Sequence, residues 1–145
     1  MEGLSHDQAH WSPIGKTVPI AAHYAHVVTA EDAMFATAIA KKGAPLMASM
    51  PTGLSELPPQ GPWDEWARKL KVDKPKFHAY VQKVYAQTDA ILAGMKDTDL
   101  QNIVDSPAGQ MPVLAFATVL LLNGAAHAGE ISAIKGLQGL KGYPF

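Results

Sequence analysis

Residues 110–135 read QMPVLAFATVLLLNGAAHAGEISAIK, and this stretch decides the fold. We expect one long helix over these residues, with Gly136 as its end. The stretch is apolar nearly all round, which predicts a helix that is buried on most sides. Its unbroken apolar run, residues 111–122, is shorter than the roughly 20 residues of a membrane span, so a core helix is favoured over a membrane helix.

Three polar side chains interrupt the apolar surface of this helix. At about 100° per residue, Asn123, His127 and Glu130 fall on one face together with apolar residues such as Phe116. Burying a polar group without a partner costs on the order of 1–3 kcal/mol. Three such groups in line therefore predict a hydrogen-bond network, a bound ligand or a metal ion.

A second helix, expected over residues 20–42, carries a matching pattern. His23 and His26 lie three residues apart, so they share a face, and small residues continue that face. Metal ligands in helical bundles project inward from facing helices in this way, which predicts one polar cavity shared by the two helices. The alternative is that each histidine is a core residue, bonded to a backbone carbonyl or to a carboxylate such as Glu31 or Glu130.

The rest of the chain completes an all-α domain spanning residues 1–145. Residues 43–62 contain five prolines and three glycines, which indicates a long connection or a lid. A helix should begin near Trp63, which with Trp66 we interpret as a packing anchor. It should pause before Pro75 and continue with an apolar stripe to about Met95. Residues 105–109 indicate a turn, and no alternating pattern predicts a strand.

Composition excludes several classes of function. The chain has 145 residues and a formal net charge of -1, and Arg68 is its single arginine, so a nucleic-acid partner is not expected. It has no cysteine, which excludes thiolate metal sites and cysteine nucleophiles, whereas six histidines supply imidazole ligands. The first residues lack the basic and apolar segments of a secretory signal, so we expect a cytoplasmic protein with no membrane partner.

Three short elements, distributed over most of the chain, resemble a known family. They are Leu4-Ser5 followed by Trp11-Ser12-Pro13, then His26 followed by Glu31, and finally His127-Ala128-Gly129-Glu130-Ile131. With these elements the sequence resembles the DinB-like (damage-inducible, YfiT-like) metalloenzyme superfamily. The resemblance implies an up-down four-helix bundle that holds a divalent metal, zinc or nickel, through three histidines.

The resemblance also implies positions for the metal ligands. The first ligand falls on His26, the last on His127, and the middle one on Asn123, where the family has histidine. An amide oxygen is a poorer zinc ligand than imidazole. His23, one turn before His26, or the carboxylate of Glu130 is an alternative third ligand.

The family's first helix is expected to be short or missing here, because the Leu4-Ser5 element stands almost at the start of the sequence. An apolar face left uncovered would form a large exposed patch, which soluble monomers rarely tolerate. We therefore expect a homodimer.

Two classes of function follow for this DinB-like bundle. The first is a metal-dependent hydrolase or thiol-dependent transferase that acts on a small molecule, because a bound divalent metal activates water or a thiol at neutral pH. Glu130 is its candidate catalytic residue, and either Glu130 or Glu31 would orient an imidazole or move a proton. The alternative is a metal-free bundle that binds a small ligand, or a structural dimer whose site is degenerate.

Overall fold

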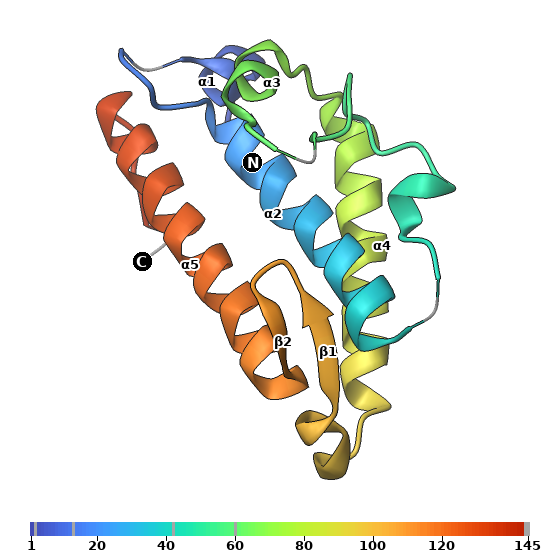
Figure 1. Ribbon diagram of the computed structural model, residues 1–145. Coiled ribbons are helices and arrows are strands. Elements are labelled where there is room, and N and C mark those ends of the chain that lie inside the picture. The colour runs from blue at the N-terminus through green and yellow to red at the C-terminus, as the bar shows by residue number, and fades with distance from the viewer. Residues whose placement is uncertain (2, 13, 42, 60, 144–145) are drawn as a thin grey trace.

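The computed structural model describes residues 1, 3–12, 14–41, 43–59 and 61–143. Three long helices dominate it (Figure 1): α2 (Ile20–Met34), α4 (Lys74–Ala93) and α5 (Val113–Leu137). Helix α2 lies in the middle and packs against both α4 and α5. The short helices α1 (His6–His10) and α3 (Asp64–Lys69) cover the end of the bundle where α2 begins. The protein is therefore mostly helical, as the sequence predicts.

A small β hairpin between α4 and α5 corrects one prediction. Strands β1 (Ile103–Ser106) and β2 (Gly109–Pro112) pair antiparallel, with Ile103 opposite Pro112 and Ser106 opposite Gly109. The Ser106 hydroxyl donates to the Gly109 carbonyl at 2.6 Å, and Gly109 has a φ of 104°. Strands of four residues are too short for an alternating pattern to stand out in the sequence. The hairpin takes up residues 110–112, so α5 begins at Val113.

Helix α2 also ends earlier than the expected residue 42. It passes at Phe35 into a π-helical turn, η1 (Phe35–Ile39), and the chain then reverses through Lys41 at φ 50° and Gly43 at φ 92°. A 3₁₀ turn, η2 (Leu46–Ala48), follows in the long connection. A second 3₁₀ turn, η3 (Asp97–Gln101), leads from α4 into the hairpin. The predicted interruption before Pro75 is the start of α4, where the Asp73 side chain accepts a hydrogen bond from the Lys76 amide.

The buried carboxylate of Asp32 ties the long connection to the core. Asp32 is fully buried on α2, and its oxygens accept hydrogen bonds from the amides of Leu46 and Met47, each at 2.9 Å. The hydroxyl of Tyr80 on α4, also fully buried, donates to the same carboxylate at 2.8 Å. One side chain thus joins α2, α4 and η2 in the main core.

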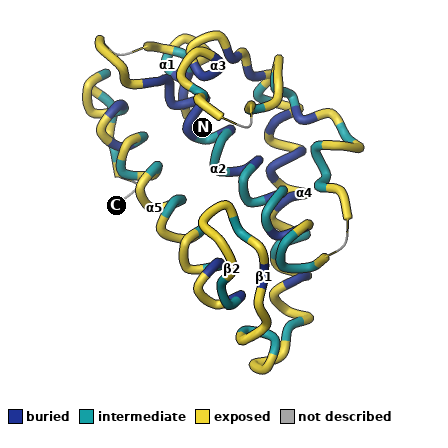
Figure 2. Tube along the Cα trace, viewed as in Figure 1, coloured by how far each residue is buried: buried dark blue, intermediate teal, exposed yellow. Residues whose placement is uncertain are grey.

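Helix α5 is far more exposed than its composition predicts (Figure 2). Its buried residues are Val113, Phe116, Ser132 and Ile134, whereas Leu121 and Leu122 keep 72% and 63% of their surface exposed. The expectation of burial on most sides is therefore wrong for the single chain, because α5 packs on α2 and the hairpin along one side only. By length and composition alone α5 could cross a membrane, which is weak evidence on its own.

Candidate metal centre

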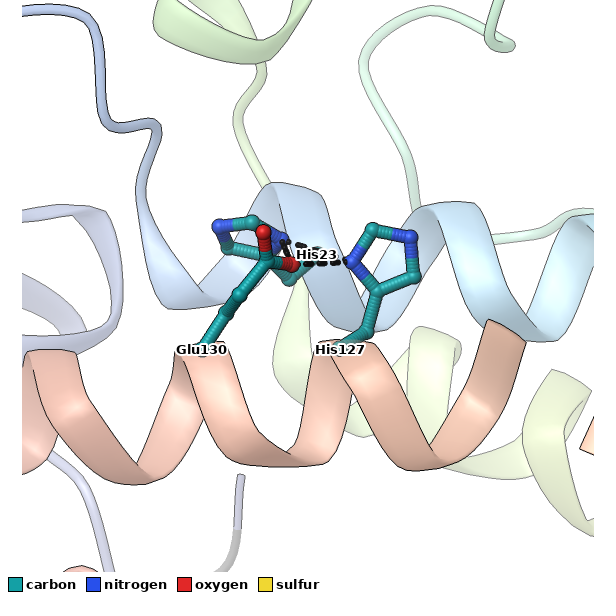
Figure 3. A group of neighbouring side chains, drawn as sticks. All are labelled: His23, His127 and Glu130. Atoms are coloured by element: carbon teal, nitrogen blue, oxygen red, sulfur yellow. Dashed lines mark hydrogen bonds and ion pairs between the residues drawn. The ribbon is translucent and has the colours of Figure 1, made fainter. Parts of the chain in front are cut away.

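Three side chains converge between α2 and α5 (Figure 3). His23 Nδ1 lies 3.0 Å from His127 Nδ1 and 3.1 Å from Glu130 Oε2, and His127 Nδ1 lies 2.5 Å from the same carboxylate oxygen. His127 and Glu130 are one helical turn apart on α5, so both point towards α2. The arrangement brings two imidazoles and one carboxylate to one point.

These three ligand atoms fit the donor set of a divalent metal. Ligands bound at about 2.0–2.1 Å in tetrahedral geometry stand roughly 3.3 Å apart. The two contacts of His23 therefore need to open by only a few tenths of an ångström, and the contact between His127 and Glu130 by about 0.8 Å. Two imidazoles with one carboxylate form a set that leaves coordination positions open for water or substrate. The group of His23, His127 and Glu130 could therefore hold a metal ion.

The three side chains of the group are buried to different degrees. The side chain of His23 is 5% exposed and that of His127 13%, whereas Glu130 is 52% exposed. Burial lowers the pKa of His23, with His127 adding to the effect and the negative charge of Glu130 opposing it. His23 is thus neutral at pH 7, with a ring nitrogen lone pair available. Solvent reaches the group from the side of Glu130.

The core-histidine alternative stays open for His23. Its Nδ1 lies 3.1 Å from the Glu130 carboxylate, which is the kind of partner that this alternative requires. Its polar contacts with His127 and Glu130 are all made through Nδ1, which is also the ring nitrogen that a metal bound by the group would use.

His26 lies beside the group without sharing its three-atom contact. Its ring stands 5.0 Å from that of His127 and stacks on Trp63 at 4.9 Å, with 23° between the planes. Burial lowers the pKa of His26, and the neighbouring imidazoles of His127 and His23 lower it further. His26 is a neutral imidazole at pH 7, placed next to the candidate metal ligands.

Asn123 stands apart from the group. It lies one turn before His127 on α5 and lines a cavity between α2, α4 and α5. Its amide forms no hydrogen bond within the part of the chain that the structure describes. The structure thus brings His23, His127 and Glu130 together, places His26 at their edge, and leaves Asn123 facing a neighbouring space.

Trp63, which the sequence predicts only as a packing anchor, is a member of the site. Its indole meets the rings of His23 and His127 edge-on at 5.7 and 5.9 Å, in addition to stacking on His26. It also packs against the main core and Trp66, so the anchor role is real as well. No spacing in the sequence relates residue 63 to the histidines, because its position depends on the path of the long connection after η1.

The fold and the site define a class: a mostly helical protein in which two facing helices present histidines and a carboxylate at one point. A sequence profile of the DinB superfamily matches residues 1–131, and the chain belongs to this superfamily. No curated protein and no solved structure shows significant similarity to the chain.

Proposed function

We propose that the protein is a metal-dependent enzyme that acts on a small molecule, either as a hydrolase or as a thiol-dependent transferase. His23, His127 and Glu130 would hold a divalent ion, zinc or nickel, and their convergence within 3.1 Å is the observation that carries the proposal. When bound, such an ion lowers the pKa of a coordinated water or thiol and so supplies a nucleophile at neutral pH.

The residues around the group have separate tasks in this proposal. Glu130 Oε2 contacts Nδ1 of His127 and keeps the group open to solvent on one side, and both atoms would bind the ion in place of this contact. Trp63 covers the histidine rings on another side and excludes water there. His26 or Asn123 completes the donor set only if a side chain turns, because neither shares the three-atom contact.

Metal-dependent stability of a set of variants tests this proposal. Protein stripped of metal should gain thermal stability when zinc or nickel is added, by about 2.7 kcal/mol at 100 times the dissociation constant. His127→Ala and Glu130→Gln should lose the metal-dependent gain, whereas the matched control His78→Ala, at an exposed position on α4, should keep it. A gain that persists in His127→Ala would contradict the assignment.

The second candidate is a metal-free bundle, and one observation favours it. The three side chains already contact one another within hydrogen-bonding distance without an ion. In that case added metal leaves the stability of the wild-type protein unchanged, and His127→Ala is destabilising to the same degree with and without metal.

We also propose that the protein is a homodimer formed through the outer stripe of α5. The stripe consists of exposed apolar residues at helical spacing: Ala115, Val119, Leu122, Ala126, Ala133 and Leu137. No charged residue lies on α5 before Glu130, so the stripe suits a second identical helix. A standard interface buries about 800 Å² per partner, and we expect the outer stripe to form its centre.

We propose a cytoplasmic location for the protein, because a second copy that covers the outer stripe removes the apolar surface that would otherwise favour a membrane. Light scattering should show a dimer that Leu122→Lys converts to a monomer, with Lys83→Leu on α4 as a control that leaves it intact. A monomer at high micromolar concentration, or recovery of the protein in the membrane fraction of cells, would contradict this proposal.

A further inference from the structure

Two neighbouring cavities lie along α2 between α4 and α5, and we refer to the pair as the cleft. It consists of a cavity of about 520 Å³ and a neighbouring cavity of about 500 Å³, which share Val27, Gly124 and Ala128. The second cavity includes His127 in its lining. The cleft therefore extends from the middle of the bundle to one residue of the candidate metal centre.

Helix α2 forms the floor of this cleft. Ile20, Tyr24, Val27 and Glu31 line it at the spacing of a single helical face. Ile20 and Glu31 are eleven residues apart, so the floor is about 16 Å long at about 1.5 Å per residue. The small residues Gly124 and Ala128 keep the cleft open on the α5 side, where a Cβ at position 124 would meet nothing within 4 Å.

The lining of the first cavity is apolar apart from three side chains. They are Glu31, Thr88 and Asn123, and Glu31 is the single charged residue among the described residues that line it. The hydroxyl of Thr88 donates to Glu31 Oε1 at 2.7 Å, which leaves the second carboxylate oxygen available. Burial raises the pKa of Glu31, with Asp89 and Asp32 adding to the effect. A cationic group in the cavity would pair with this half-buried carboxylate.

We propose that this cleft binds the substrate, an elongated apolar molecule with an amine or another cationic donor that pairs with Glu31. Its reacting group lies at the other end, beside His127. The unpaired amide of Asn123 supplies a second polar contact between these two ends. The assignment of the molecule as a substrate rests on the proposed metal-dependent function, whereas the ligand class rests on the cleft alone.

Calorimetric titration of metal-free protein with three matched probes tests the ligand class: n-octylamine, n-octanol and octanoate, each below its aggregation threshold. We expect 1:1 binding of n-octylamine, about tenfold tighter than octanoate, because a charge-assisted hydrogen bond is stronger than a neutral one and the carboxylate repels a second carboxylate. Glu31→Gln should abolish the preference for the amine, and the matched control Glu56→Gln, at an exposed residue, should retain it.

A second pair of variants places the probe in the cleft. Gly124→Leu should weaken n-octylamine binding about tenfold by filling the cleft. It should also keep the protein folded, because leucine favours a helix over glycine by about 1 kcal/mol. The control Gly136→Leu makes the same change on the same helix, where a Cβ also meets nothing within 4 Å, and should leave binding unaltered.

The outcomes separate this inference from the proposed function. Equal binding of the three probes, or binding that Gly124→Leu does not change, would overturn the inference. Absence of probe binding together with a dimer that Gly124→Leu dissociates would show that a second copy occupies the cleft, and would also overturn it. Amine binding by a protein that binds no metal would overturn the proposed function and leave the ligand class of the cleft standing.

Discussion

Removing the hydroxyl of Tyr80 should destabilise the protein with little change in its shape. Tyr80 is fully buried, and its hydroxyl donates to the equally buried carboxylate of Asp32 at 2.8 Å. A hydrogen bond to a charged group contributes about 1.5–3 kcal/mol net. Tyr80→Phe fills the same space, so the loss comes from the hydrogen bond and not from a cavity.

Urea unfolding followed by circular dichroism measures this loss. We expect Tyr80→Phe to lower the free energy of unfolding by about 2 kcal/mol, which corresponds to roughly 5–10 °C in Tm for a chain of this size. The matched control Tyr85→Phe, at a side chain that is 40% exposed, should cost less than about 1 kcal/mol. A loss below about 0.5 kcal/mol in Tyr80→Phe would refute the view that Asp32 joins α2, α4 and the long connection.

Three further predictions follow from individual residues. Because burial raises the pKa of Glu31 above 4.5, its protonated form stabilises the fold at low pH, and this contribution is lost as the pH rises through the folded-state pKa. Glu31→Gln should therefore raise Tm at pH 7 and leave it unchanged at pH 4, and an equal shift at both pH values would contradict the argument. Gly53 has a φ of +78°, and a Cβ there would lie 2.8 Å from the Asp73 carbonyl oxygen. Gly53→Ala should cost about 3 kcal/mol in urea unfolding, against about 1 kcal/mol for Gly15→Ala, where the φ is also positive but the space is open. Trp63→Phe should lower zinc affinity measured by competition with a chelator, because the rings of the candidate ligands His23 and His127 lose their edge-on contacts with the indole; unchanged affinity would show that Trp63 only packs.

The sequence predicts the long helices well, because each carries a helical pattern over many turns. The interruption before Pro75 and the turn around residues 105–109 also correspond to features of the structure. The hairpin and the early end of α2 could not be predicted in the same way. Strand pairing over four residues and a π-helical turn depend on contacts made in the folded chain, which leave no periodic trace.

The candidate site, too, could be predicted only in part from the sequence. Spacing on one helix places His127 and Glu130 together, and the structure adds that His23 on α2 meets both of them. The choice of His23 over His26 depends on the rotation of α2 against α5, which the sequence does not specify. The predicted burial of α5 was wrong, because an apolar composition indicates that a helix can be buried but not how many elements pack against it.

Equilibrium dialysis of untagged, metal-free protein against zinc, with metal counted by elemental analysis, tests the central claim most directly. We expect close to one equivalent of zinc per chain for the wild-type protein and for His78→Ala, and less than about a tenth of an equivalent for the double variant His23→Ala/His127→Ala. Wild-type protein that retains no more zinc than the double variant would contradict it.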